Sequence, residues 1–363
     1  MASDRKLRIG VVGGGFGASF HFHEHPLAEV VAVSDLLPDR RQHLKERYRC
    51  DTAYDSLEEL IRHEPLDAVA VFSGAPDHVR QSVAVMEHGK HCFCAVPAAT
   101  TLEECALLVA TKERTGMRYM MAETSYYRVD AITARRLHDD GAFGELMYSE
   151  VEYYHPLIGA EGDALSFADG ERTWRYGLPP QLYPTHSTGF LVGVTGERLV
   201  KVSCAGTLSG DRGHSDNVYG SPFSNECAVF ITDQGHICRS NVMWNVWNHG
   251  ERAQWMGTDC SLFAEGWSGQ PFAIRPMEGE PQMTPAEYTH LLPREMRYDT
   301  GHGGSHPFLT HEFVSAVIED REPAVDVYEA VAMTAPGIVA HESALRDGEQ
   351  LPVPSFDPTP REE

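Results

Sequence analysis

The chain has 363 residues, of which 42% are hydrophobic, and its formal net charge at pH 7 is -23. This length predicts one to three domains, with two as the central expectation, and the hydrophobic content is sufficient for buried cores. The acidic balance argues against binding of nucleic acid or of an anionic membrane surface, because both kinds of partner require a basic surface.

Export and membrane-insertion segments are not evident in the sequence. The N-terminal residues MASDRKLRIGVV lack the apolar region and the small-residue cleavage site of a signal peptide. No apolar run approaches the roughly 18 residues that a transmembrane helix needs. The eight cysteines are too few for a disulfide scaffold, and Cys92 and Cys94 alternate along an apolar run, as buried free thiols do. We therefore expect a cytoplasmic protein.

The first third of the chain alternates between apolar runs and stretches of helical character. The runs are LRIGVVGGG, EVVAVSD, DAVAVFSG, KHCFCAVP and RYMMAET. Buried strands that alternate with helices predict βαβ units and a doubly wound parallel sheet, which is an α/β architecture. Thr100-Thr101 followed by Glu103-Glu104 indicates a capping box at one helix start. We expect this domain to cover residues 1–124.

The remainder of the chain, residues 125–363, shows a different pattern. A helix over VDAITARRLHDDGAFG is followed by stretches of period two, and the turn TDQGH between two of them predicts a hairpin. Two further helices are expected over PFLTHEFVSAVIED and DVYEAVAMTAPGIVAHESALRDG. The pattern predicts an α+β domain with a mostly antiparallel sheet.

The segment IGVVGGGFGA has the spacing G-x-G-x-x-A directly after the first strand, at Gly13, Gly15 and Ala18. Such a turn lets the backbone approach a pyrophosphate and is typical of a Rossmann dinucleotide site at a helix start. Asp35, at the end of the next strand, suits a ribose 2'-hydroxyl, so the sequence favours NAD, while Arg40 and Arg41 keep NADP possible. Further cofactor contacts are predicted at Phe16, Gly17, Arg40, Ser73, Pro76, His78 and Pro97.

Several segments together resemble the Gfo/Idh/MocA family of oxidoreductases. They are GVVGGGFGASFH, VVAVSDLLPDRR, APDHVRQSVAVMEHGKHCFCAVPAATTLEE and the two terminal helices, so the resemblance covers nearly the whole chain. It implies NAD(P)-dependent chemistry on alcohols or carbonyls of sugars, cyclitols and related molecules. Some members instead retain NAD and cleave glycosidic bonds by elimination. The resemblance also implies that residues 125–363 bind the substrate and form a homo-oligomer, a dimer or a tetramer, through the open face of the antiparallel sheet.

The chain departs from the family pattern at two motifs. The usual Glu-Lys-Pro is replaced by Ala95-Val96-Pro97. The second motif keeps its histidine at His186, but Leu182 and Gly189 stand where aspartates are expected. The lysine-centred proton relay of the family is therefore absent. Val96 would form an apolar wall beside the nicotinamide, and other residues must carry the protons.

Three residues are candidates for this chemistry. His186 has a side chain that can act as acid or base near neutral pH, although it could instead cap a helix that starts near Ser187. Tyr183, three residues earlier, would face the same way on a helical turn, or could simply pack against the loop. Glu123 closes a strand and would point toward the cofactor, or could act as a helix N-cap.

Substrate contacts are predicted at Tyr126, Arg175 and His306. Tyr126 and Tyr127 follow the strand that Glu123 closes, and Arg175 lies between Trp174 and Tyr176, where aromatic rings could stack on a sugar. His306 would stand at a helix N-terminus in DTGHGGSHPFLTHEF, ahead of Pro307.

The remaining histidines receive weaker assignments. His302 is a weaker substrate candidate than His306, and His311 is expected to pack. The histidines of SFHFHEHP, His21, His23 and His25, lack the spacing of a metal motif, and no metal is assigned.

These observations support one main hypothesis and two alternatives. The main hypothesis is an NAD-dependent oxidoreductase of a carbohydrate or cyclitol, with His186 as acid and base. The first alternative is a glycosidase that uses tightly bound NAD for transient oxidation and elimination. The second alternative is a non-catalytic nucleotide-binding sensor.

Overall fold

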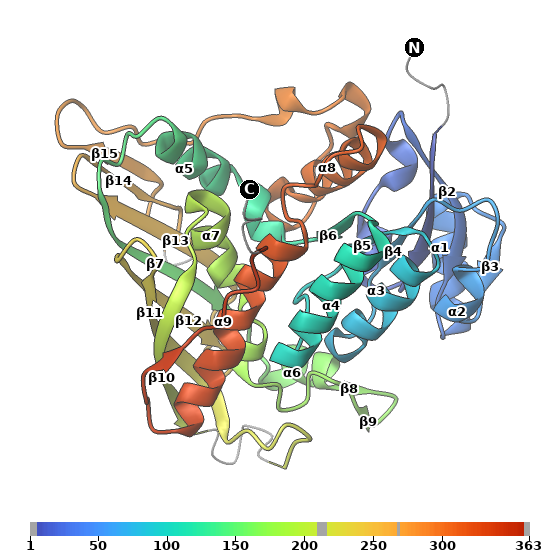
Figure 1. Cartoon of the computed structure of the whole chain (residues 1–363), viewed down its shortest axis with the longest axis horizontal. Coiled ribbons are helices and arrows are strands. Elements are labelled where there is room, and N and C mark those ends of the chain that lie inside the picture. The colour runs from blue at the N-terminus through green and yellow to red at the C-terminus, as the bar shows by residue number, and fades with distance from the viewer. Residues whose placement is uncertain (1–5, 209–215, 267–268, 359–363) are drawn as a thin grey trace. The chain divides into compact units, whose positions relative to one another are not determined.

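The structure is a computed structural model that describes residues 6–208, 216–266 and 269–358. The chain forms two compact units, each built from two segments (Figure 1). Unit 1 comprises Met1–Arg128 and Glu287–Val331, and unit 2 comprises Val129–Ala286 and Ala332–Glu363.

Unit 1 contains a parallel sheet of six strands in the order β3-β2-β1-β4-β5-β6. The strands are β1 Leu7–Val12, β2 Ala28–Ser34, β3 Ala53–Tyr54, β4 Ala68–Val71, β5 His91–Cys94 and β6 Tyr119–Met121. The chain reverses direction across the sheet between β1 and β4, which is the point where doubly wound folds bind their ligands. The predicted α/β architecture is confirmed.

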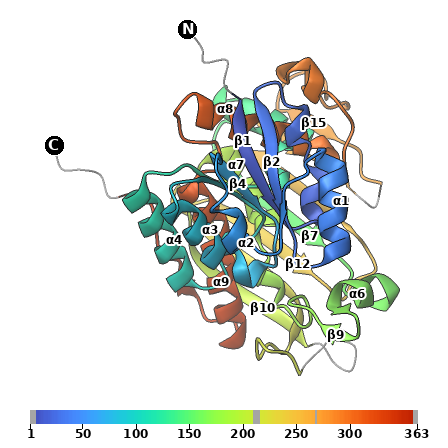
Figure 2. The same cartoon turned by 90° about the vertical axis from the view of Figure 1, so that its right-hand side faces the viewer.

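Helices cover both faces of this sheet (Figure 2). They are α1 Pro38–Tyr48, α2 Leu57–Leu60, α3 His78–Glu87, α4 Leu102–Thr115 and α8 His306–Ile318, with short 3-10 turns η3 Ala75–Asp77, η4 Thr124–Tyr127, η7 Thr289–Leu291, η8 Arg294–Met296 and η9 His302–Gly304. The predicted capping box is confirmed at α4, where the Thr101 side chain accepts the Glu104 N–H and the Glu104 side chain accepts the Thr101 N–H.

The prediction of an α-helix directly after the glycine-rich turn is wrong. Two 3-10 turns replace it, η1 Phe16–Ser19 and η2 Phe22–Glu24. The reason is tertiary: Phe20 and Phe22 are both completely buried, and residues two apart cannot occupy one face of an α-helix. A four-residue turn has a weak dipole, so the local attraction for a phosphate must come from backbone N–H groups and side chains.

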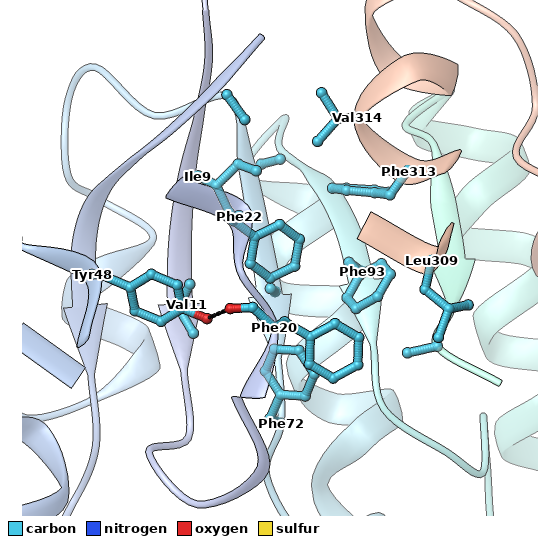
Figure 3. Close-up of a cluster of buried hydrophobic side chains, with 14 of the residues drawn as sticks. Ile9, Val11, Phe20, Phe22, Tyr48, Phe72, Phe93, Leu309, Phe313 and Val314 are labelled. Carbon is cyan, nitrogen blue, oxygen red and sulfur yellow. Dashed lines mark hydrogen bonds between the residues drawn. The ribbon is translucent and has the colours of Figure 1, made fainter. Parts of the chain in front are cut away.

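The core of unit 1 is rich in phenylalanine (Figure 3). Phe20 stacks with Phe22 and lies against Phe72, with ring centroids 6.0 and 4.8 Å apart. The Tyr48 hydroxyl lies within hydrogen-bonding distance of the Gly17 and Phe20 carbonyl oxygens, which fixes the chain just after the glycine turn. Side chains of α8 complete the cluster: Leu309, Phe313 and Val314.

Unit 2 is built on a sheet of eight strands in the order β15-β14-β13-β7-β12-β11-β10-β16. The strands are β7 Leu146–Tyr154, β10 Leu199–Leu208, β11 Phe223–Thr232, β12 Ile237–Met243, β13 Gly250–Gly257, β14 Cys260–Phe263, β15 Ala273–Pro276 and β16 Leu351–Pro352. Only the β12–β7 pair is parallel among these described strands. The predicted hairpin at TDQGH is confirmed by β11 and β12.

The helices of unit 2 include one that is buried along nearly its full length. This is α7 Thr185–Thr195, which follows the 3-10 turn η5 Pro180–Leu182. The others are α5 Val129–Asp139, α6 Gly159–Ser166 and the part of α9 Val327–Leu345 that belongs to this unit, with a small hairpin of β8 Phe167–Ala168 and β9 Glu171–Arg172. No helix in the described part of the chain is both long and apolar enough to cross a membrane.

Candidate active site

The glycine-rich turn of unit 1 has a backbone that only glycine permits. Gly13 has a φ of 99°, and a Cβ there would lie 2.5 Å from the Phe72 carbonyl oxygen. A Cβ on Gly17 would lie 2.8 Å from the Phe72 ring. These two glycines therefore press the turn against the end of β4, as a dinucleotide turn requires.

The residues around Gly15 fit a bound pyrophosphate. A Cβ on Gly15 would meet only the Arg40 Nη1 atom, at 4.0 Å, so the space above this residue is open and lies beside a guanidinium group. At the end of the neighbouring strand β4, the buried Ser73 hydroxyl has no hydrogen-bond partner among the described residues. Open backbone, a nearby cation and an unused hydroxyl are the features that an anionic nucleotide would engage.

Asp35 braces the same turn. Its carboxylate is buried and accepts the Gly14 N–H at 2.6 Å and the Leu37 N–H at 2.8 Å. Arg41 is engaged elsewhere, since it donates to the Asp35 carbonyl oxygen and pairs with Asp55. A carboxylate at this position suits a free ribose hydroxyl and would repel a 2'-phosphate.

His78 links two of the strand ends that surround this turn. Its ring nitrogens lie 2.8 Å from the Pro97 carbonyl oxygen and 3.1 Å from the Ser73 carbonyl oxygen. Burial lowers the pKa of this imidazole, and the two carbonyl groups oppose the shift. The predicted contacts at Ser73, His78 and Pro97 are thus connected to one another, and His78 acts here as a buried clamp.

The strand end that departs from the family pattern is buried and apolar. Ala95 and Val96 are 7% and 6% exposed, and the Val96–Pro97 peptide bond is cis. No proton-carrying side chain stands in these two positions.

Glu123 and Tyr126 lie at the neighbouring strand end, after β6. Glu123 is completely buried, and its carboxylate accepts the Ser125 N–H at 2.8 Å, so it caps η4. Tyr126 packs edge-on against Tyr127, with ring centroids 4.9 Å apart. Their roles as acid or base and as substrate contact remain predictions.

His306 is the first residue of α8, and Pro307 lies in the first turn, as the sequence predicts. Its ring is buried and stacks on Phe20 with a centroid distance of 4.4 Å, while Phe16 of the glycine turn meets it edge-on at 5.4 Å. Burial lowers the pKa of His306 to about 4, so the imidazole is neutral at pH 7. The structure thus brings His306 next to the glycine turn, and its contact with substrate remains a prediction.

The histidines of SFHFHEHP do not converge. His21 stacks on Tyr298, His23 pairs with Glu24 and His25 lies 3.0 Å from His311. Within residues 6–208, 216–266 and 269–358, no three His, Cys, Asp or Glu side chains are arranged to hold a metal ion.

In unit 2, His186 stands in the first turn of α7 among aromatic rings. Tyr153 of β7 and Tyr183 meet it edge-on, with centroid distances of 4.7 and 5.4 Å. Tyr183 and His186 are therefore neighbours, as predicted, but Tyr183 precedes α7 and its φ of -128° and ψ of 56° are not helical. The chain bends at Tyr183, and Pro184 is the N-cap of α7.

Arg175 lies against the same aromatic group. Its guanidinium carbon is 4.3 Å from the Trp174 ring centroid and 5.0 Å from that of Tyr183. Its Nη2 atom is 3.5 Å from the Tyr183 hydroxyl, at the outer limit of a hydrogen bond. The predicted Arg175 and Tyr183 are thus brought together with His186 in one unit. A fixed cation beside aromatic faces can bind a hydroxyl-rich ring.

His155 and His249 extend this group. Their rings lie 4.2 Å apart, and His155 also meets Tyr153 at 6.1 Å. Burial lowers the pKa of His155 to about 4, with the charges of His249, Arg175 and His186 adding to the shift. His155 is therefore a neutral hydrogen-bonding group at pH 7.

Residues 7–123 match the family described as oxidoreductases with an NAD-binding Rossmann fold, Gfo/Idh/MocA, and residues 225–360 match the C-terminal domain of glycosyl hydrolase 109. The resemblance to the Gfo/Idh/MocA oxidoreductases is confirmed for the NAD-binding domain. The protein is therefore an enzyme of the oxidoreductase type, its cofactor is NAD, and the sensor alternative is set aside.

The most similar proteins include glycosidases and dehydrogenases. A glycosyl hydrolase family 109 protein of Saccharopolyspora erythraea is 24% identical over 96% of this chain and 83% of that protein. An alpha-N-acetylgalactosaminidase of Tannerella forsythia is 25% identical over 82% of this chain and 72% of that protein. A solved structure of levoglucosan dehydrogenase with NADH and L-sorbose shares the fold, with a TM-score of 0.80 and 16% identity over 97% of this chain and all of that one.

Unit 2 also contains a buried hydrogen-bonded pair of a carboxylate and a histidine that sequence reasoning missed. The fully buried Glu226 of β11 accepts the Gln181 N–H of η5 at 2.7 Å and pairs with His341 of α9 at 2.6 Å. On the other side of η5, a Cβ on Gly337 would lie 2.2 Å from the Gln181 carbonyl oxygen. These contacts fix η5, and η5 leads directly into Tyr183 and His186.

One signal for this pair was present in the sequence. Alternate residues of β11 are buried, and Glu226 falls on the buried side together with Ser224 and Ala228. A carboxylate on the buried face of a strand needs a partner. The identity of that partner could not be read from the strand itself.

Proposed function

We propose that this protein cleaves a glycosidic bond of a carbohydrate, using an NAD that stays bound through the catalytic cycle. The observation that supports this most directly is the match of residues 225–360 to the glycosyl hydrolase 109 C-terminal domain, in a chain whose position 96 carries a buried valine in place of the relay lysine. The relative named alpha-N-acetylgalactosaminidase makes an α-linked N-acetylgalactosamine the first sugar to test.

Unit 1 would hold the cofactor. The backbone of Gly13 to Gly15 and the Arg40 guanidinium would bind the pyrophosphate, and Asp35 would accept a ribose hydroxyl. Bound NAD would supply a reversible acceptor for the hydride of one ring carbon. Val96 and Ala95 would keep the strand end apolar and exclude water from it.

Unit 2 would supply the proton carriers. Glycoside elimination needs a group that takes the proton of a C–H bond next to a ring carbonyl and a group that protonates the departing oxygen. Tyr183 and His186 are two such groups with ring centroids only 5.4 Å apart. Arg175 would orient the sugar and hold Tyr183 in place through their 3.5 Å contact.

The proposed reaction consumes only the glycoside and water. His186 would take the proton of the sugar hydroxyl and pass it to the departing glycosidic oxygen. Tyr183, in its phenolate form, would take the proton of the acidified C–H bond and return it to the ring hydroxyl oxygen at the end of the cycle. Water then adds across the resulting double bond, and the hydride returns to the ring. The net reaction is hydrolysis, so NADH does not accumulate.

A simple carbohydrate dehydrogenase is the second candidate. The fold similarity to levoglucosan dehydrogenase, with a TM-score of 0.80, favours it. In that case His186 would remove the hydroxyl proton, and turnover would produce one NADH per sugar.

Substrate turnover separates the two candidates. The purified protein is mixed with aryl α-N-acetylgalactosaminide, other aryl glycosides and free sugars, and aglycone release and NADH absorbance are followed together. We expect the aglycone to be released in excess over the NAD present, without a net rise in NADH absorbance. Net NADH formation without aglycone release would contradict the proposal and support the dehydrogenase.

A further inference from the structure

Trp247 is an exposed indole on the segment of unit 2 that joins β12 to β13. It lies between β12 and β13 and is 80% exposed, whereas Trp244 and Trp255 are 3% and 0% exposed. An indole carries one of the largest apolar surfaces of any side chain, so leaving it in water forgoes a large burial energy. This position therefore offers a large apolar surface to a ligand.

The segment that carries Trp247 is held at both ends. At the first end, Asn225 Oδ1 accepts the N–H groups of Trp244 and Asn245 at 3.1 and 2.9 Å, and the Trp244 indole N–H donates to the Leu178 carbonyl oxygen at 2.8 Å. At the other end, the His249 ring packs on His155. Trp247 is thus presented from a fixed support.

The indole also rests against backbone. A Cβ on Gly159, the first residue of α6, would lie 3.4 Å from the Trp247 Cζ3 atom, and the φ of Gly159 is 70°. Because no side chain stands on Gly159, the ring edge can approach the main chain at this point. One side of the ring is supported, and most of its surface remains in solvent.

Trp247 is connected to the candidate acid and base through Tyr153. The Tyr153 ring contacts His186 at 4.7 Å and Trp244 at 5.7 Å, so the residue that packs on His186 also packs on the base of the Trp247 segment. All of these residues belong to unit 2.

We propose that Trp247 is the stacking platform for a second sugar ring, next to the sugar that reacts. An indole face binds the C–H face of a pyranose, and the neighbouring amide of Asn248 and imidazole of His249 can bind its hydroxyl groups. This inference rests on the proposed function and refines its substrate class: the protein selects oligosaccharides over glycosides with a small leaving group.

The test compares two substrates in the wild type, two variants of Trp247 and one control variant. A trisaccharide that ends in α-linked N-acetylgalactosamine and methyl α-N-acetylgalactosaminide are assayed with the wild type, Trp247→Ala and Trp247→Phe. In Trp247→Ala, the ratio of kcat/KM for the trisaccharide to that for the methyl glycoside is expected to fall about tenfold, because one stacking contact is lost. Trp247→Phe is expected to restore most of the ratio. Met277→Ala, at a residue 71% exposed in unit 2, is the matched control.

A binding measurement separates failure of the platform from failure of the proposed function. The trisaccharide is titrated while tryptophan fluorescence is recorded, without turnover. A fluorescence change in the wild type that is lost in Trp247→Phe supports the platform, even if no glycoside is cleaved. An equal selectivity ratio in Trp247→Ala and wild type, or an unaltered fluorescence change in Trp247→Phe, would overturn it.

Discussion

Asp35 connects the shape of the glycine turn to the choice of cofactor. One of its carboxylate oxygens accepts the Gly14 N–H, and the other accepts the Leu37 N–H. These two hydrogen bonds to backbone N–H groups stabilise the conformation of the turn, in addition to the proposed recognition of the ribose. Its replacement should therefore affect both the nucleotide affinity and the local backbone.

Asp35→Asn is expected to weaken NAD binding about tenfold or more, because the amide replaces one acceptor with a donor that cannot bond an N–H group. Isothermal titration with NAD measures the change. Glu29→Gln, at an exposed position on β2, the strand that ends just before Asp35, is the matched control and should bind NAD like the wild type. Unchanged affinity in Asp35→Asn would remove Asp35 from the site.

His186→Gln is expected to reduce kcat about a hundredfold or more, because glutamine cannot carry a proton. NAD affinity should stay at the wild-type value, since the proposed cofactor contacts all lie in unit 1. Steady-state kinetics and NAD titration are measured on the same preparation. His138→Gln in α5 serves as the control. A kcat close to that of the wild type would exclude His186 as the acid or base.

At the scale of elements, η5 is the part of unit 2 on which the proposed chemistry depends. The buried Glu226 carboxylate accepts a hydrogen bond from its backbone and lies 2.6 Å from the His341 ring, and Gly337 of α9 allows close packing from the other side. A buried charge of this kind is costly when its partner is removed. We therefore assign Glu226 and His341 as positioning residues for Tyr183 and His186.

Glu226→Ala is expected to lower the free energy of unfolding by about 3–5 kcal/mol, and Glu226→Gln by less, because glutamine keeps an acceptor for the Gln181 N–H. Both variants should have a reduced kcat, whereas KM and NAD affinity should stay nearly unchanged. The reduction in kcat should be smaller in Glu226→Gln than in Glu226→Ala. Urea denaturation and steady-state kinetics provide the values. If kcat and stability both remain at wild-type levels in Glu226→Ala, the positioning role is wrong.

The elements differ in how well the sequence predicts them. The parallel strands, the capping box at Thr101 and the β11–β12 hairpin depend on neighbouring residues, and all three are confirmed. The helix after Gly17 is not formed because Phe20 and Phe22 bury against residues from distant strands. Likewise, Glu226 and His341 are 115 positions apart, so local periodicity could not pair them.

At the scale of the whole molecule, buried histidines couple stability to pH. The pKa values of four of them are lowered by burial to about 4: His21, His25, His155 and His306. The usual value is 6.5, so between pH 6.5 and 4 the unfolded chain binds more protons than the folded chain. These groups therefore stabilise the fold fully above pH 6.5, and their contribution is lost as the pH falls toward 4.

His155→Gln is expected to reduce the loss of stability between pH 7 and pH 4.5, because one of these protonation costs is removed. Thermal unfolding midpoints are compared at both pH values. His88→Gln, at an exposed position, is expected to behave like the wild type. An identical pH dependence in wild type and His155→Gln would show that His155 is not held neutral by burial.

The central claim is that the whole protein combines an NAD-binding oxidoreductase unit with acid and base groups that open a glycosidic bond by elimination. The most direct test is to run the cleavage of an α-N-acetylgalactosaminide in D2O, exchange the product back into H2O and determine its deuterium content by mass spectrometry and NMR. Elimination through an acidified C–H bond predicts one deuterium retained on a ring carbon of the released sugar. Aglycone release with no carbon-bound deuterium would contradict the account.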